Sequence, residues 1–141
     1  MLKTIVVALD CSELSRLVIE ALDALQTSPE TKVVLVYVLP SPGTDNDLPA
    51  DRPHPSQESL YVTIEKKLQA YQSQIPGSEL ELVNGDPAEE IIRLANIYQA
   101  DLIVIGTRGL KGFKRIIEGS VSSQVVADAP CSVLVVKPKN I

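Results

Sequence analysis

Four short apolar runs constrain the fold of this chain more than any other feature. They are Ile5–Leu9, Val33–Leu39, Leu102–Ile105 and Val133–Val136, and none of them alternates apolar with polar residues. Uninterrupted runs of this length are typical of parallel strands that are covered on both faces. A fifth run, Glu79–Val83, alternates glutamate and leucine, which predicts a half-exposed strand at the edge of the sheet.

Segments with helical spacing of apolar residues lie between these strands. One follows Ser12, a suitable N-cap, and another runs through Leu60–Tyr71. The third has the clearest start signal. Asp86 can cap the helix, Pro87 suits its first position, and Glu89 completes a capping box.

A fourth helix is expected to begin near Ser120 and to end before Pro130. Strands and helices then alternate, which predicts an α/β fold in which residues 1–141 form one domain. We expect an open five-stranded parallel sheet of order 3-2-1-4-5 with helices on both faces. Residues 40–56 contain five prolines, and they predict a flexible surface loop.

Composition narrows the class of function. The chain has 141 residues and a net charge of −5, which argues against nucleic-acid and acidic-membrane binding. No apolar run approaches the roughly 20 residues that span a bilayer. Asp10 comes too early for a signal peptide, so a cytoplasmic location is expected. Cys11 and Cys131 should lie at opposite ends of the sheet, as two reduced thiols.

The glycines and positive charge of this acidic chain are concentrated in residues 106–122. That stretch holds four of the seven glycines and four basic residues against one acid. In the predicted strand order, the order of the strands reverses between the first and the fourth strand of the chain. Asp10 and Gly106 directly follow these two strands. Open α/β sheets bind ligands at this point. Glycine backbone N–H groups and a helix that begins at Gly119-Ser120 suit a phosphate.

The spacing Gly106-x2-Gly109-x9-Gly119-Ser120 matches the signature G-x2-G-x9-G-[ST]. Through this motif the chain resembles the nucleotide-binding branch of the universal stress protein family. The resemblance extends over the whole chain, through IVVALDCSELS, VNGDPAEEIIRLANIYQADLIVIGTRG and APCSVLVVKP. It implies ATP binding, a five-stranded α/β fold and a homodimer.

The resemblance also implies roles for particular residues. Ala8, Asp10 and Val38 would surround adenine and ribose, with Asp10 hydrogen-bonded to the sugar, and Ile105 would line the pocket. The phosphates would be held, chiefly through backbone N–H groups, by Gly106, Arg108, Gly109, Gly119, Ser120, Val121 and Ser122. The chain departs from the usual family pattern at Ala8, where many relatives have Pro, and at Cys11, where many have Gly.

Dimerisation has an argument of its own. The strand Ser132–Lys137 would be a sheet edge, yet its centre reads Val-Leu-Val-Val without a charge. An exposed apolar edge strand favours pairing with another chain. We therefore expect a homodimer through this strand, and the family resemblance implies the same pairing.

Catalytic groups are few in this sequence. His54 is the only histidine and lies in the proline-rich segment, so no nucleophile–histidine–acid set stands out. Asp10 is the one acid expected near the site, and it is not expected to be a direct metal ligand, although it could hold Mg²⁺ through a bound water. The favoured hypothesis is thus an ATP-binding, homodimeric module for signalling or stress response. Two alternatives stay open: a stress-related dimeric scaffold that binds no nucleotide, and a slow nucleotide hydrolase.

Overall fold

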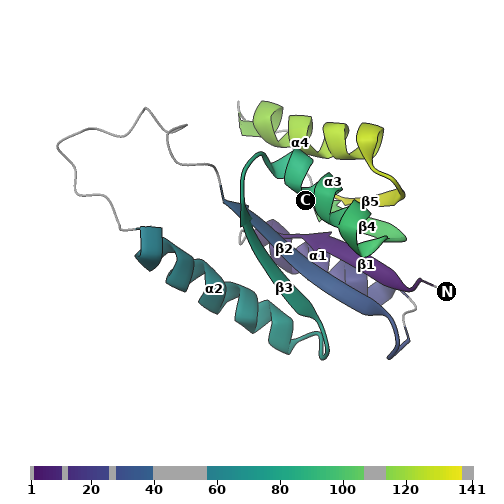
Figure 1. The fold of residues 1–141 in the computed structure, drawn as a ribbon, viewed down its shortest axis with the longest axis horizontal. Helices are drawn as coiled ribbons and strands as arrows, with labels where there is room; N and C mark the ends of the chain where they lie inside the picture. The colour runs from purple at the N-terminus through teal and green to yellow at the C-terminus, as the bar shows by residue number, and fades with distance from the viewer. Residues whose placement is uncertain (1, 11–12, 26–27, 40–56, 107–113, 138–141) are drawn as a thin grey trace.

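The computed structural model describes residues 2–10, 13–25, 28–39, 57–106 and 114–137. Strands and helices alternate along these residues (Figure 1). The strands are β1 (Thr4–Ala8), β2 (Lys32–Leu39), β3 (Glu79–Asn84), β4 (Leu102–Gly106) and β5 (Ser132–Val136). The helices are α1 (Glu13–Ala24), α2 (Gln57–Ser73), α3 (Pro87–Tyr98) and α4 (Lys114–Asp128).

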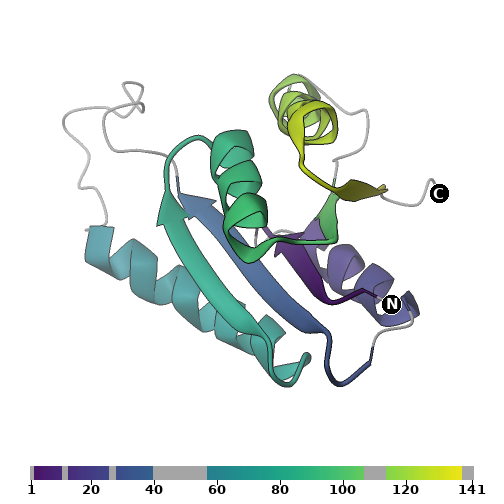
Figure 2. The ribbon, with the colours of Figure 1, turned by 45° about the vertical axis from the view of Figure 1, so that its right-hand side comes forward.

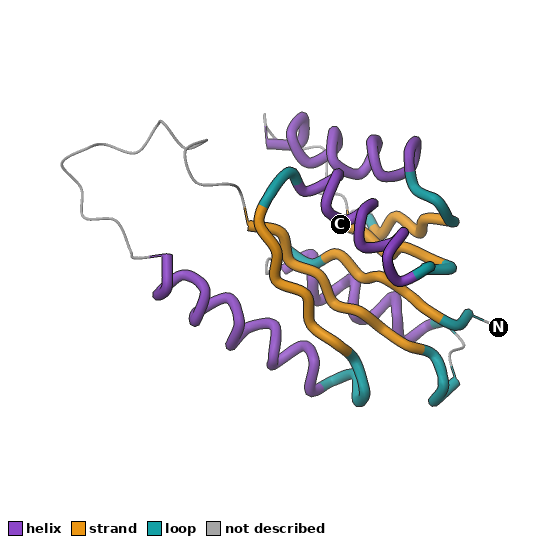
Figure 3. Tube along the Cα trace, viewed as in Figure 1, coloured by secondary structure: helices purple, strands orange, loops and turns teal. Residues whose placement is uncertain are grey.

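The strands form one parallel sheet of order β3-β2-β1-β4-β5, so the predicted topology is confirmed (Figure 3). The order reverses at β1, which pairs with β2 on one side and with β4 on the other. The carboxyl ends of β1 and β4 therefore lie next to each other, where neither connection covers the edge between them.

Helices cover both faces of the sheet (Figure 2). Helices α1 and α2 pack on one face, where Val18, Leu22 and Leu68 join the odd-numbered side chains of β1 and β2. Helices α3 and α4 pack on the other face, where Leu94 and Val125 join the even-numbered ones. The sandwich of helix, sheet and helix explains why the central strands read as continuous apolar runs.

The edge strand β3 differs from the central strands as its sequence predicts. Ile5, Val6 and Val7 of β1 are completely buried, whereas Leu80 and Leu82 of β3 are only partly buried. Glu79 and Glu81 alternate with these leucines, and the salt bridge between Glu79 and Lys32 lies at the surface. The alternation of the sequence thus marks β3 as a partly buried strand at the edge of the sheet.

The predicted beginning of the last helix is wrong. Helix α4 begins at Lys114 instead of near Ser120, and its end at Asp128 lies before Pro130 as expected. The sequence Lys-Arg-Ile-Ile-Glu contains good or acceptable helix formers, and Gly119 costs only about 1 kcal/mol inside a helix. Ser12 and the segment 40–56, with His54, lie outside the described residues. Among the helices that the structure describes, none is long and apolar enough to cross a bilayer.

Candidate functional site

A cavity of about 260 Å³ lies at the carboxyl ends of β1, β2 and β4. Its lining comes from these strand ends, from the first turns of α1 and α3, and from the middle of α4. The lining residues are Ala8, Leu9, Asp10, Ser15, Val18, Val36, Tyr37, Val38, Pro87, Ile91, Ile105, Gly106 and Val121. The position is the one where open α/β sheets bind ligands, as the sequence predicts.

One carboxylate in this cavity is held by a buried hydroxyl. The Ser15 hydroxyl, on the first turn of α1, donates to Oδ1 of Asp10 over 2.9 Å. The same Oγ accepts a hydrogen bond from the backbone N–H of Asp10 over 3.0 Å. Ser15 is only 1% exposed, while Asp10 is exposed. The carboxylate of Asp10 is therefore hydrogen-bonded to a buried group, while the residue itself lines the cavity and stays accessible to solvent.

The remaining walls are mainly apolar. Val36 and Val38 of β2 and Ile105 of β4 point to the α3 and α4 side of the sheet, where Ile91 and Val121 face them. An apolar cleft with a few polar groups at its mouth is the usual form of a small-molecule site. Such a cleft suits a flat, weakly polar ring, and Asp10 offers acceptors for the hydroxyl or amine groups of the same ligand.

The start of α3 places two of the wall residues. Gly85, with φ +142°, turns the chain after β3, and a Cβ at this position would lie 3.0 Å from Cγ of Glu90. Asp86 then caps the helix by accepting from Glu89 N over 3.0 Å, with Pro87 in the first turn. The predicted cap is confirmed, and it directs Pro87 and Ile91 toward the cavity.

The structure brings many of the predicted site residues together. Ala8, Asp10, Val38, Ile105, Gly106 and Val121 all line the cavity. Ser122 is buried in α4, at 7% exposure, and is not among the lining residues. Arg108 and Gly109 lie outside the described residues. Gly119 and Ser120 lie within α4 instead of at its N-terminus, so the predicted placement of these two residues at a helix start is wrong.

Sequence reasoning missed several wall residues, above all Ser15. This serine precedes Val18, Ile19 and Leu22 by three, four and seven residues, and these three are buried. Ser15 thus stands on the apolar face of its helix. A polar residue on an apolar face was the available signal. Tyr37 packs against the core and also lines the cavity.

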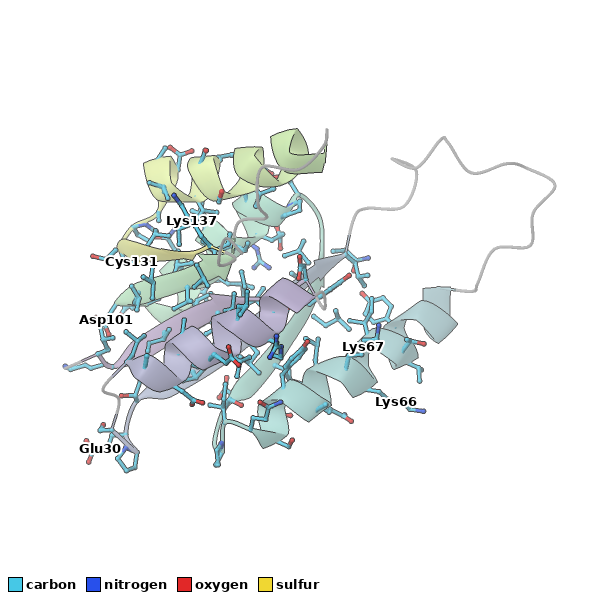
Figure 4. The ribbon with its side chains drawn as sticks, turned by 180° about the vertical axis from the view of Figure 1, so that it is seen from behind. Glu30, Lys66, Lys67, Asp101, Cys131 and Lys137 are labelled. Atoms are coloured by element: carbon cyan, nitrogen blue, oxygen red, sulfur yellow. The ribbon has the colours of Figure 1, made fainter. Side chains whose placement is uncertain are left out.

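Two titratable groups with shifted pKa values lie at the opposite end of the sheet. Cys131 and Asp101 lie there, just before β5 and β4 (Figure 4). Burial, followed by the negative charge of Asp101, raises the pKa of the Cys131 thiol, which is free and stays protonated at neutral pH. Cys11 lies outside the described residues. Within the part of the chain that the structure describes, no group of three His, Cys, Asp or Glu residues could hold a metal ion.

Comparison with known proteins identifies the family to which this chain is similar. A model of the universal stress protein family matches residues 1–137. Universal stress protein Sll1388 of Synechocystis sp. (strain ATCC 27184 / PCC 6803 / Kazusa) is 29% identical over 148 residues, which cover 94% of this chain and 96% of that protein.

Solved structures agree on the fold. Hypothetical protein MJ0577 has a TM-score of 0.77 at 26% identity, with 99% of this chain and 98% of that chain covered. A universal stress protein in complex with cAMP has a TM-score of 0.65 at 24% identity, covering 96% of each chain. A universal stress protein from Archaeoglobus fulgidus in complex with dAMP has a TM-score of 0.62 at 22% identity, covering 95% of this chain and 97% of that one. Because the family model matches nearly the whole chain, and the fold is shared from end to end, this chain belongs to the universal stress protein family.

Proposed function

We propose that the protein binds an adenine nucleotide, with ATP as the first candidate, in the cavity at the carboxyl ends of β1 and β4. One observation carries this proposal. A single cavity at the reversal of the strand order combines apolar walls, the held carboxylate of Asp10 and the glycine that opens the glycine motif, Gly106. Its volume of about 260 Å³ is close to the lower end of small-molecule sites, roughly 300 Å³.

We infer a partner for each part of the nucleotide. Adenine fits between Val38, Ile105 and the other apolar walls, near Ala8, and the ribose hydroxyls donate to Asp10. The phosphates would be held by Gly106 and the motif residues that follow it in the sequence: Arg108, Gly109, Gly119, Ser120, Val121 and Ser122. Mg²⁺ would accompany ATP, and Asp10 can hold it through a bound water.

Two structural neighbours support the choice of ligand class. They share the fold of this chain and were solved in complex with cAMP and with dAMP. Both ligands contain adenine, a sugar and a phosphate. These complexes name the ligands to test, while the proposal for this chain depends on the residues of its own cavity.

Binding, rather than turnover, is the role that the cavity favours. Among its described lining residues, Asp10 is the only carboxylate, so these residues offer no acid pair for general acid–base work. We propose a module for signalling or stress response whose surface changes when nucleotide binds, with ATP hydrolysis slow at most. A cytoplasmic location stays a prediction.

We also propose that the protein is a homodimer through Ser132–Lys137. Strand β5 is an edge of the sheet, and its residues Val133–Val136 are only partly buried in the single chain. Pairing with a second copy would cover this apolar edge. Sedimentation equilibrium at micromolar concentration is expected to give the mass of two chains, and the mass of one chain would contradict the proposal.

The nucleotide proposal is tested by calorimetric titration of ATP with Mg²⁺ into nucleotide-free protein. We expect a micromolar dissociation constant for the wild type and a large loss of affinity in Gly109→Val. The matched control is Gly112→Val, which changes a glycine of the same segment outside the G-x2-G-x9-G motif. If the folded wild type binds no adenine nucleotide, the proposal fails and the scaffold alternative replaces it.

A further inference from the structure

We propose that Ser15 is a positioning residue, which orients the Asp10 carboxylate and thereby makes the site prefer ribonucleotides to deoxyribonucleotides. This inference rests on the proposed function, because it concerns the sugar of a nucleotide in the same cavity. Ser15 lies in α1, outside the glycine motif, and the inference gives it a role in selecting the ligand.

The geometry of the pair carries the first step. A single hydroxyl both donates to Oδ1 of Asp10, over 2.9 Å, and accepts from the backbone N–H of Asp10, over 3.0 Å. The Ser15 hydroxyl is thereby tied to both ends of the Asp10 residue. Rotation of the Asp10 side chain would break the first of these bonds. The direction of the carboxylate is thus set before a ligand arrives.

The anchor itself is buried. Ser15 is 1% exposed and lies on the face of α1 that packs Val18 and Leu22 into the core. Its hydroxyl is therefore shielded from solvent. A functional group that is supported by a buried residue on a helix is held more closely than one on a free loop.

The consequence concerns the sugar. The two hydroxyls of a ribose are neighbouring donors, and an ionised carboxylate can accept both because it has about four lone-pair sites. A carboxylate oxygen that accepts one hydrogen bond has a second lone pair. A carboxylate fixed in direction can accept from both hydroxyls without first losing rotational freedom, whereas a deoxyribose offers it only one donor.

The test is a titration of ATP, 2′-deoxy-ATP and 3′-deoxy-ATP into the wild type and Ser15→Ala. We expect the wild type to prefer ATP. In Ser15→Ala, affinity for ATP is expected to fall about tenfold, and that for either deoxy analogue less than about threefold, so that the preference largely disappears. A general loss of structure would lower the affinity for all three nucleotides equally.

Three further variants make the test specific. In an Asp10→Ala background, Ser15→Ala is expected to have no further effect on affinity, because Ser15 acts through Asp10. Ser15→Thr keeps a hydroxyl and should retain the preference for ATP. The matched control is Ser78→Ala, a buried serine at the opposite end of the sheet, which should bind all three nucleotides as the wild type does.

The outcomes separate this inference from the proposed function. A folded wild type that binds none of the three nucleotides overturns both. A wild type that binds ATP, with an unchanged preference in Ser15→Ala, overturns only the role of Ser15. Should Ser15→Ala not fold by circular dichroism, Ser15→Cys, of similar size but a weaker donor, is compared in its place and is expected to reduce the preference for ATP.

Discussion

The two ends of the sheet each carry a cavity, and the larger one is the poorer candidate for the site. The cavity at the amino ends of the strands measures about 440 Å³, against about 260 Å³ at the carboxyl ends. Its lining comes largely from the turns before β2 and β3, including Ser28, Thr31 and Ser78. The difference lies in what the polar groups do at each end.

At the amino end, polar groups hold the chain together. The carboxylate of Asp101 accepts from the backbone N–H groups of Lys3 and Thr4, over 2.8 and 2.9 Å. The Thr31 hydroxyl donates to the carbonyl of Leu2 over 2.8 Å. These bonds fasten the beginning of β1 to the segments before β4 and β2. Their partners are backbone groups, and the bonds serve the fold.

Two buried serines show the same contrast at the level of one residue. Ser15 holds a carboxylate that faces a cavity, whereas Ser78 has a buried hydroxyl with no hydrogen-bond partner among the described residues. Ser15 therefore holds a cavity-lining carboxylate at one end of the sheet, and Ser78 leaves a buried polar atom without a described partner at the other. Polar groups held in position around a cavity indicate a site better than the size of the cavity does.

The largest expected effect at the carboxyl end is that of Asp10→Ala. Removal of this carboxylate is expected to weaken ATP binding about 10- to 100-fold, because hydrogen bonds to a charged group contribute roughly 1.5–3 kcal/mol. Titration calorimetry measures the change. Asp23→Ala is the matched control, since Asp23 lines the cavity at the amino end. Equal losses in the two variants would erase the distinction between the ends.

A smaller effect is expected for Asp86→Ala, which removes the cap of α3 that accepts from Glu89 N. Loss of an N-cap lowers the free energy of unfolding by about 1 kcal/mol. The affinity for nucleotide should fall slightly as well, because the helix start places Pro87 and Ile91 in the cavity wall. Urea unfolding and calorimetry measure the two quantities.

The control for the cap is Glu89→Ala. The structure shows the half of the capping box in which Asp86 accepts, and Glu89→Ala leaves that backbone bond in place. This variant should lose only a few tenths of a kcal/mol, the contribution of an acid near a helix N-terminus. A loss as large as that of Asp86→Ala would mean that the cap hydrogen bond is not the main stabilising contact.

Most of the fold follows from features that act locally in the sequence. The apolar runs of β1, β2 and β4 could be recognised because both faces are covered, and the Glu-Leu alternation of β3 marks an edge. Asp86 and Pro87 predicted a helix start because a cap depends on a few neighbouring residues. The start of α4 could not be predicted in this way, because Gly119 resembles a boundary but is tolerated within a helix.

The site was predictable only where strands end. Asp10 and Gly106 directly follow two strands that the topology makes neighbours, so strand order alone placed them together. Ser15, Pro87 and Ile91 enter the cavity because of how α1 and α3 pack, and packing is set by the whole domain. Sequence reasoning therefore found the carboxylate but missed the hydroxyl that holds it.

At the amino end, Ser78→Ala is expected to stabilise the protein. Its Oγ is buried without a described partner, and such a hydroxyl costs free energy that an alanine does not. The free energy of unfolding should rise by about 1 kcal/mol, measured by urea unfolding, with unchanged nucleotide affinity. Ser15→Ala is the matched comparison and should lower stability, because it removes two hydrogen bonds. A destabilised Ser78→Ala would show that this hydroxyl has a stabilising partner.

The smallest expected effect concerns Asp101, and it depends on pH. Hydrogen bonds from the backbone of Thr4 and then of Lys3 hold the pKa of Asp101 below its usual value of 3.8. A carboxylate whose pKa is lowered by folding stabilises the protein above its unfolded pKa, and this contribution is lost as the pH falls through the folded value. The melting temperature of Asp101→Asn should thus lie below that of the wild type near neutral pH, and the difference should shrink as the pH falls below 3.8.

Thermal unfolding followed by circular dichroism measures this difference in melting temperature. Asp128→Asn, a change in an exposed acid at the end of α4, is the control for the lost charge. A difference that stays constant across this pH range would mean that the ionised carboxylate of Asp101 does not fasten the start of β1, and the contrast between the two ends of the sheet would lose its clearest structural contact.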